Sequence, residues 1–226
     1  MESSNLEFYR NSIDYILSVQ NKDGSIPWEL DEKLDPWDHI EATMGLSIAG
    51  KKDEAEKAFL WLSDSQLQDG SWYAEYLNSI PMTQRKETNF SAYIGTGLWH
   101  YYLIFKDKDF IENMLPTLSK ALDFVLSMQT ENGDIYWAYE EGKQILDDSL
   151  ITGSSSIYKS LECTAAILNL FDKPIESIIV SMEKLKSSIN NNPERYDRSW
   201  ESKSRYSMDW YYPILCGIYD HCLLYT

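Results

Sequence analysis

The chain has 226 residues, which is enough for one domain with a sizeable core. Its content of 43% hydrophobic and 25% charged residues is typical of a folded globular protein and excludes a disordered or collagen-like chain. Because 20 Lys and Arg face 36 Asp and Glu, the formal charge is −16, which disfavours nucleic acids and anionic lipid surfaces as partners.

The first residues and the cysteines predict a cytoplasmic protein. The opening segment MESSNLEFYR lacks the basic stretch and apolar core of a secretory signal. No apolar run approaches the roughly 20 residues of a membrane-spanning helix, so no integral membrane segment is expected. Cys163, Cys216 and Cys222 are an odd and sparse set, which indicates reduced thiols rather than a disulfide framework.

A repeat organises the chain from its N-terminal part onward. Segments 20–28, 66–72 and 129–137 each begin with Gln, continue to Asp-Gly or Asn-Gly, and reach Trp two or four residues after the glycine. Apolar residues at helical spacing precede each segment. The pattern predicts an outer helix that the glycine ends as a C-terminal cap. The Gln amide can then bond the backbone of a neighbouring helix end, and the Trp can cover that junction.

A second class of helix is predicted after each turn. Asp35 and Pro36 are typical residues for opening the first of them. Small residues such as Ala92, Gly95 and Ala165 suit close packing on more than one face, as in an inner layer. These inner helices are expected at 36–49, 87–105, 152–171 and 207–224, with the last outer helix at 174–190. No segment alternates as a strand does, so we expect one all-α domain over residues 1–226, built from four outer–inner hairpins.

The second repeat resembles the QW motif of squalene–hopene and oxidosqualene cyclases. It reads Lys57-Ala58-x-x-Trp61-Leu62-x-x-x-Gln66-x-x-x-Gly70-x-Trp72, and 120–137 is a close copy. The resemblance implies the α/α toroid of terpenoid cyclases and protein prenyltransferases. Blocks such as 88–102 and 205–213 also resemble small bacterial prenyltransferase-like proteins. Toroids of that superfamily have six hairpins. A four-hairpin chain is therefore either a short or C-terminally truncated version, or its partial ring is closed by a second copy or a partner chain.

The chemical signatures of those families are missing from the sequence. The acidic cluster at 147–149 is the nearest match to an Asp-x-Asp-Asp motif, and its pattern differs. Cys216, His221 and Cys222 lack the spacing of zinc ligands. We therefore expect no metal site and no cofactor, with Mg²⁺ involved only if the substrate is a diphosphate.

Candidate catalytic residues lie at the starts of the inner helices, which converge on the central cavity of a toroid. Asp38 and Glu41 are three residues apart and can share a helical face. A carboxylate beside His39 in an aromatic cavity can have a raised pKa and act as a general acid, so Asp38, oriented by His39, is the first candidate. Asp209 is the second. The structural alternative is that Asp38 caps the helix and Glu41 is solvated.

The same helix starts carry candidates for substrate binding. Three consecutive aromatic residues at 210–212 predict a cavity or a packed wall. Arg205 or Lys159 would hold an anionic group. The Gly/Ser-rich turn at 152–156 can present backbone N–H groups to an anion or act as an ordinary helix cap. The candidates are Trp37, Asn89, Tyr93, Ser155, Tyr158, Lys159, Glu162, Arg205, Trp210 and Tyr211.

Two chemistries suit an aromatic cavity of this kind. Trp and Tyr faces stabilise developing carbocations in isoprenoid reactions, and they also stack on sugars on which paired carboxylates act. With the family resemblance, the first interpretation is a prenyltransferase-like or terpenoid cyclase-like enzyme for an isoprenoid or similarly bulky small molecule. The alternative is a carbohydrate-active hydrolase, lyase or epimerase that uses Asp38, Glu41 or Asp209, and the hydrophilic lining favours it. A non-catalytic binding module is the third interpretation.

Overall fold

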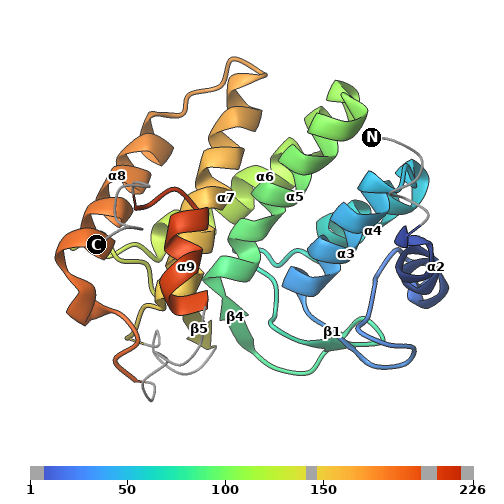
Figure 1. Ribbon diagram of the computed structural model, residues 1–226, viewed down its shortest axis with the longest axis horizontal. Helices are drawn as coiled ribbons and strands as arrows, with labels where there is room; N and C mark the ends of the chain where they lie inside the picture. The colour runs from blue at the N-terminus through green and yellow to red at the C-terminus, as the bar shows by residue number, and fades with distance from the viewer. Residues whose placement is uncertain (1–7, 141–146, 200–207, 220–226) are drawn as a thin grey trace.

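The helices form two concentric layers, as the repeats predicted. The computed structural model describes residues 8–140, 147–199 and 208–219 (Figure 1). Inner helices α3, α5, α7 and α9 contact one another in that order, and outer helices pack against them. The outer layer is α2 (Arg10–Val19), α4 (Lys52–Ser65), α6 (Lys108–Ser127) and α8 (Glu176–Asn191). The inner layer is α3 (Pro36–Ile48), α5 (Thr88–Phe105), α7 (Ile151–Asn169) and α9 (Met208–Leu215). The all-α toroid-like fold is thus confirmed.

The last inner helix is shorter than the sequence pattern predicted, because a glycine ends it. Gly217 has a φ of +81°, and its N–H bonds the Ile214 carbonyl at 3.0 Å. The next N–H, of Ile218, bonds the Pro213 carbonyl at 3.0 Å. These two bonds form a Schellman motif, which closes the C-terminal end of a helix. The expected helix over 207–224 therefore ends at Leu215.

Short strands occupy the loops that lead from outer to inner helices, where the sequence predicted none. They contain only two or three residues, which is too few for an alternating pattern to show. The strands are β1 (Lys33–Leu34), β2 (Tyr76–Leu77), β3 (Ile80–Pro81), β4 (Arg85–Glu87) and β5 (Ala138–Glu140). The first three form an antiparallel sheet, and β4 pairs with β5. The labelled strands lie at one end of the helices, so these loops build a common face there (Figure 1).

Each repeat glutamine ties its own turn to the backbone of the next outer helix; the bond to a neighbouring helix was predicted, but it was expected at the helix end, and Thr117 lies in the middle of α6. The amide nitrogen Nε2 of Gln66 donates to the Gly70 carbonyl at 3.0 Å and to the Thr117 carbonyl of α6 at 2.9 Å. The other copies repeat the pair of bonds, with Gln20 on Gly24 and Glu54 and Gln129 on Gly133 and Ser181. One amide therefore sets both the shape of a turn and the spacing of two outer helices.

The repeat glycines do not cap the helices, contrary to the prediction. Helix α4 ends at Ser65, and Gly70 lies further along in a tight turn with a φ of +91°. A Cβ at Gly70 would lie 2.0 Å from the carbonyl oxygen of Lys120 in the next outer helix. Gly24 and Gly133 have the same conformation against Lys57 and Lys184. Glycine is needed because the turn approaches a backbone too closely for any side chain.

The two spacings of the repeat tryptophans are not equivalent. Trp72, two residues after its glycine, is buried, and its Nε1 donates to the Leu62 carbonyl at 2.9 Å. Ile26 and Ile135 fill the matching position in the other copies and are also buried. Trp28, four residues after its glycine, is 48% exposed. The side chain that covers the junction is thus the one two places after the glycine, and Trp28 is available for another role.

Two further sequence expectations concern membranes and cysteines. No helix in the described part of the chain is both long and apolar enough to cross a membrane. Cys163 and Cys216 are buried free thiols, and burial raises the pKa of both, to about 11 for Cys216. Cys222 lies outside the described residues.

Candidate active site at the starts of α3 and α5

Helix α3 begins at a buried carboxylate. Asp35 has extended backbone angles, and its Oδ1 accepts the Asp38 N–H at 2.9 Å, while Pro36 occupies the first helical position. The other oxygen, Oδ2, accepts the indole N–H of Trp28 at 2.8 Å. Asp35 is only 6% exposed, so both oxygens meet protein donors rather than water. The residue is fixed in position by two bonds from opposite sides.

The two aspartates of this turn have different surroundings. Burial raises the pKa of Asp35 to about 6, and the charge of Asp38 contributes to this rise. The N–H donors of Asp38 and Trp28 act in the opposite direction, because they stabilise the ionised carboxylate. Asp38 itself is exposed and stands one helical turn further on. Two carboxyl groups on one turn, one of which has a raised pKa, form an arrangement suited to acid–base chemistry.

A third carboxylate stands at the start of α5. Glu87 is the N-terminal flanking residue of that helix, and burial raises its pKa, opposed by Arg85, whose Nε donates to Oε1 at 2.9 Å. The charge of Asp35 raises the pKa of Glu87 further, so the two helix starts interact electrostatically. The guanidinium of Arg85 lies 5.9 Å from the ring centre of Trp137. The adjacent ends of α3 and α5 therefore gather acidic, basic and aromatic groups.

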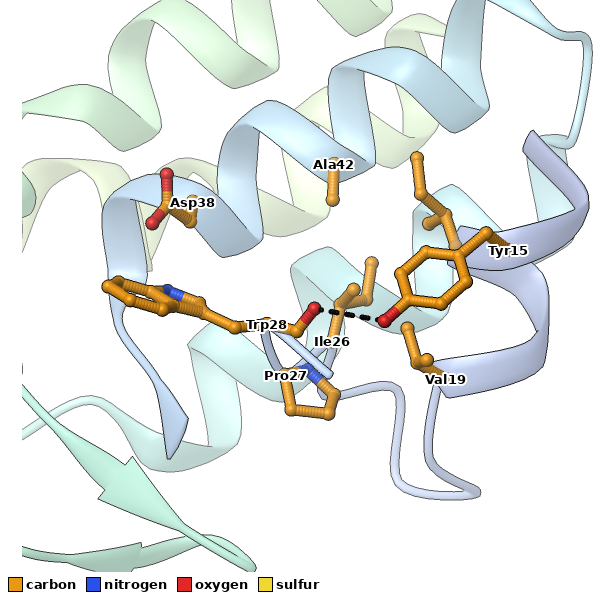
Figure 2. A pocket seen from close by; sticks show the side chains of 8 residues that line it. Tyr15, Val19, Ile26, Pro27, Trp28, Asp38 and Ala42 are labelled. Carbon is orange, nitrogen blue, oxygen red and sulfur yellow. Dashed lines mark hydrogen bonds between the residues drawn. The ribbon is translucent and has the colours of Figure 1, made fainter. Parts of the chain in front are cut away.

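A pocket opens beside Asp38, between α2 and α3 (Figure 2). Its volume is about 260 Å³, slightly below the roughly 300–1,000 Å³ of pockets for drug-sized ligands. Trp28 and Asp38 stand at one end, and Tyr15 faces them, with its hydroxyl 3.5 Å from the Trp28 carbonyl oxygen. The remaining lining is apolar: Ile16, Val19, Ile26, Pro27 and Ala42. The pocket fits part of a larger molecule and brings that part to a carboxylate.

His39 has a structural role, and the prediction that it orients Asp38 is wrong. Its ring is fully buried, its Nδ1 accepts the Ile26 N–H at 3.1 Å, and its Nε2 donates to the Ala58 carbonyl at 3.0 Å. Burial lowers the pKa of His39 to about 4, which keeps the ring neutral. Neither nitrogen is left for a carboxylate. His39 instead joins the loop before α3 and helix α4 to the inner layer.

Glu41 turns toward α5, while Asp38 lines the pocket beside α2. The Trp37 Nε1 donates to Oε1 of Glu41 at 2.9 Å, and the Tyr93 hydroxyl donates to the same oxygen at 3.3 Å. The rings of Trp37 and Tyr93 stack with centres 3.9 Å apart and planes 6° apart. Three of the predicted site residues thus form one group, in which Glu41 faces Tyr93 of α5. The carboxylate that contacts the backbone of Asp38 is Asp35, which the sequence had indicated only as a helix-opening residue.

On α7, two predicted binding roles meet competing interactions. Lys159 and Glu162 are exposed and form an ion pair with each other, so the positive charge is already paired within the helix. Ser155 is buried, and its hydroxyl donates to the Ile151 carbonyl at 2.7 Å. Residues 152–156 lie inside α7 rather than in a turn. They therefore do not form the anion-binding loop that the Gly/Ser-rich composition suggested.

The other predicted residues that the structure describes lie on α5, α7 and α9. Asn89 lies against Gly153, and Tyr158 is half-buried. Within the described residues, Oδ2 of Asp209 is buried without a hydrogen-bond partner, and the ring of Tyr211 meets that of Tyr212 edge-on with centres 6.3 Å apart. Arg205 and the side chain of Trp210 lie outside the described residues. No group of three or more His, Cys, Asp or Glu side chains in the described ranges is arranged for a metal ion.

Comparison with known proteins finds a relative that is named as a sugar-acting enzyme. The chain is 37% identical over 208 residues to MMP endo-(1,4)-3-O-methyl-alpha-D-mannosidase of Mycolicibacterium hassiacum, a match over 92% of this chain and 56% of that protein. It matches no family model. The chain therefore spans little more than half the length of the curated relative.

Several solved structures with the same fold are named as enzymes that act on sugars. An unsaturated glucuronyl hydrolase specific for heparin has a TM-score of 0.64 at 15% identity, over 84% of this chain and 57% of that one. A glycoside hydrolase of family 105 from C. acetobutylicum has a TM-score of 0.66 at 14% identity, over 83% and 57%. Cellobiose 2-epimerase from Bacillus thermoamylovorans has a TM-score of 0.60 at 10% identity, over 84% and 56%. At such identities the likeness shows the fold alone.

The resemblance to terpenoid cyclases and prenyltransferases is wrong as a guide to this chain, because its relative and its structural neighbours act on sugars. The structure supplies the physical reason. The Gln and Gly of the repeat join successive outer helices through backbone contacts, as Gln66 does with Thr117. Such contacts serve any ring of helical hairpins, whatever reaction it hosts. The motif therefore reports the fold and not the chemistry.

Proposed function

We propose that this chain is a carbohydrate-active enzyme that hydrolyses glycosidic bonds, with Asp35 and Asp38 as its acid–base pair. The observation that carries the proposal is the contrast between these two carboxyl groups. Asp35 is buried with a pKa raised to about 6, and Asp38 is exposed at the rim of a pocket. Glycosidases use one protonated and one ionised carboxyl group on opposite sides of the bond that breaks.

In the proposed reaction, Asp35 is the general acid and Asp38 the general base. The indole of Trp28 covers Oδ2 of Asp35, so the substrate has to displace this indole. Asp35 then gives its proton to the glycosidic oxygen as the bond from that oxygen to the anomeric carbon breaks. Asp38 takes a proton from the water whose oxygen forms the new bond to that carbon. The N–H of Asp38 holds the other oxygen of Asp35, Oδ1, in place throughout. The reaction leaves Asp35 ionised and Asp38 protonated, and exchange of these protons with water restores the pair for the next turnover. The helix start favours each carboxylate while it is ionised.

The proposed substrate is an oligosaccharide of O-methylated mannose. The relative carries the name of a (1,4)-3-O-methyl-α-mannosidase, which supports this class. The pocket beside Asp38 supports it independently, since most of its lining is apolar. Moving a methyl ether from water into such a pocket costs little free energy. A hydroxyl group costs more there, because it gives up its hydrogen bonds to water and finds no partner in the pocket.

The test is cleavage of (1,4)-linked 3-O-methyl-α-mannose oligosaccharides, with unmethylated mannose oligosaccharides in parallel. We expect shortened products by mass spectrometry from the methylated series, and loss of at least 99% of the rate in Asp35→Asn and Asp38→Asn. Asp64→Asn is the matched control, because Asp64 is an exposed carboxylate on outer helix α4. Thermal melting of each variant checks that it is folded. Absence of both cleavage and ligand-induced stabilisation in the unsubstituted chain would refute the proposal.

A further inference from the structure

Beyond the acid–base pair, the stacked rings of Trp37 and Tyr93 are arranged in a way that core packing alone does not explain. Trp37 and Tyr93 stack almost in parallel, with ring centres 3.9 Å apart. Phe90 flanks the indole at 6.3 Å with a tilt of 47°. Tyr93 is buried, but Trp37 is only half-buried, so part of its indole stays open to solvent. The group therefore presents one aromatic side chain to the outside and backs it with another.

Glu41 fixes the orientation of both rings. Its Oε1 accepts the indole N–H of Trp37 at 2.9 Å and the hydroxyl of Tyr93 at 3.3 Å. Burial raises the pKa of Tyr93, and the charge of Glu41 raises it further, so the hydroxyl keeps the proton that it donates. Because Glu41 is exposed, its charge keeps its hydration while it holds the rings. A half-exposed indole is thereby fixed before any ligand arrives.

The position of Trp37 relates this group to the acid–base pair. Trp37 lies between Asp35 and Asp38 in the first turn of α3. The Trp37 side chain contacts α5, while Asp38 lines the pocket that α3 forms with α2. Asp38 thus lies at the pocket (Figure 2), and the residue before it in the helix, Trp37, forms the aromatic contact with α5.

We propose that Trp37, backed by Tyr93 and held by Glu41, is the stacking surface of a second sugar subsite. A substrate chain would cross Asp38 from the pocket of Figure 2 to Trp37. The C–H groups of a pyranose ring carry a small positive charge and pack against the negative face of an indole, as other positive groups do. The ligand class is a pyranoside of several units. This inference rests on the proposed function, because it assigns a further subsite to the same site.

The test compares short and long ligands in an Asp38→Asn background, which removes turnover. The probes are a disaccharide and a hexasaccharide of (1,4)-linked 3-O-methyl-α-mannose, measured by calorimetry. We expect the hexasaccharide to bind more tightly than the disaccharide. Trp37→Ala should weaken hexasaccharide binding about tenfold and change disaccharide binding less than twofold. Glu41→Ala, which keeps the indole but releases it, should give an intermediate loss.

Trp99→Ala is the matched control. Trp99 is another half-buried tryptophan that stacks on a tyrosine, Tyr102, with ring centres 5.6 Å apart, but within the described ranges no carboxylate accepts its indole N–H. It should leave both affinities unchanged. If Trp37→Ala lowers the affinity for both oligosaccharides equally, or for neither, the subsite is overturned while the proposed function stands. Failure of the chain with intact Trp37 to bind any probe would overturn the proposed function itself.

Discussion

Replacement of Gly70 by alanine tests the close approach of the repeat turns to the outer helices. Gly70 has a φ of +91°, and an added Cβ would lie 2.0 Å from the Lys120 carbonyl oxygen. Gly50 is the matched control, since it has a φ of +73° and no atom within 4 Å of an added Cβ. Both substitutions place alanine in a left-handed conformation. Only Gly70→Ala adds a collision with a backbone.

The expected cost follows from what the collision breaks. Left-handed strain accounts for about 1 kcal/mol in either variant. At Gly70 the turn must also withdraw from α6 by more than 1 Å, roughly the difference between 2.0 Å and ordinary contact. That withdrawal breaks the 2.9 Å bond from Gln66 to Thr117, worth about 1–2 kcal/mol, and loosens the packing of buried Trp72. We expect about 4 kcal/mol for Gly70→Ala and about 1 kcal/mol for Gly50→Ala.

Urea unfolding followed by circular dichroism measures both values, and thermal melting provides a second scale. For a chain of this size, the two variants should lower the melting temperature by about 10 °C and about 3 °C. Equal destabilisation by the two substitutions would refute the reasoning, because it would mean that the turn moves away from α6 at no cost.

Three further substitutions have expected results. The neutral ring of His39 has a pKa near 4 in the fold and 6.5 when unfolded, so the unfolded chain takes up a proton first as the pH falls. Stability should drop by up to about 3 kcal/mol between pH 6.5 and 4, and urea unfolding should show a flatter profile for His39→Gln. Trp28→Phe removes a donor that lowers the pKa of Asp35. The alkaline fall in hydrolysis rate should then move to higher pH, and an unchanged pH profile would contradict the assignment of Asp35 as the acid. Lys86 is buried, with Nζ 2.8 Å from an aspartate and within 6 Å of two tyrosine rings. Lys86→Met should lower the free energy of unfolding by about 2 kcal/mol. Lys33→Met breaks an exposed ion pair with Glu75 and should lower it by less than about 1 kcal/mol in the same urea unfolding assay.

Much of the architecture could be predicted from the chain alone, because its determinants are local and repeated. The spacing from Gln66 to Gly70 places an amide over its own turn, and the same spacing recurs at Gln20 and Gln129. Helical periodicity between these turns then indicates alternating outer and inner helices. The short strands and the role of Ile26 were missed because they depend on partners from other parts of the chain.

The site was predicted less completely, for a physical reason. A carboxylate has an ordinary pKa until its neighbours remove water from it, and sequence spacing does not give the depth of burial. Asp35 becomes an acid–base candidate because it is buried and bonded by Trp28 and by the first turn of α3. His39 becomes structural because Ile26 and Ala58 take both of its nitrogens. The sequence by itself determined the ring of hairpins through short, repeated contacts, and only the tertiary structure decided which charges are buried together at its end.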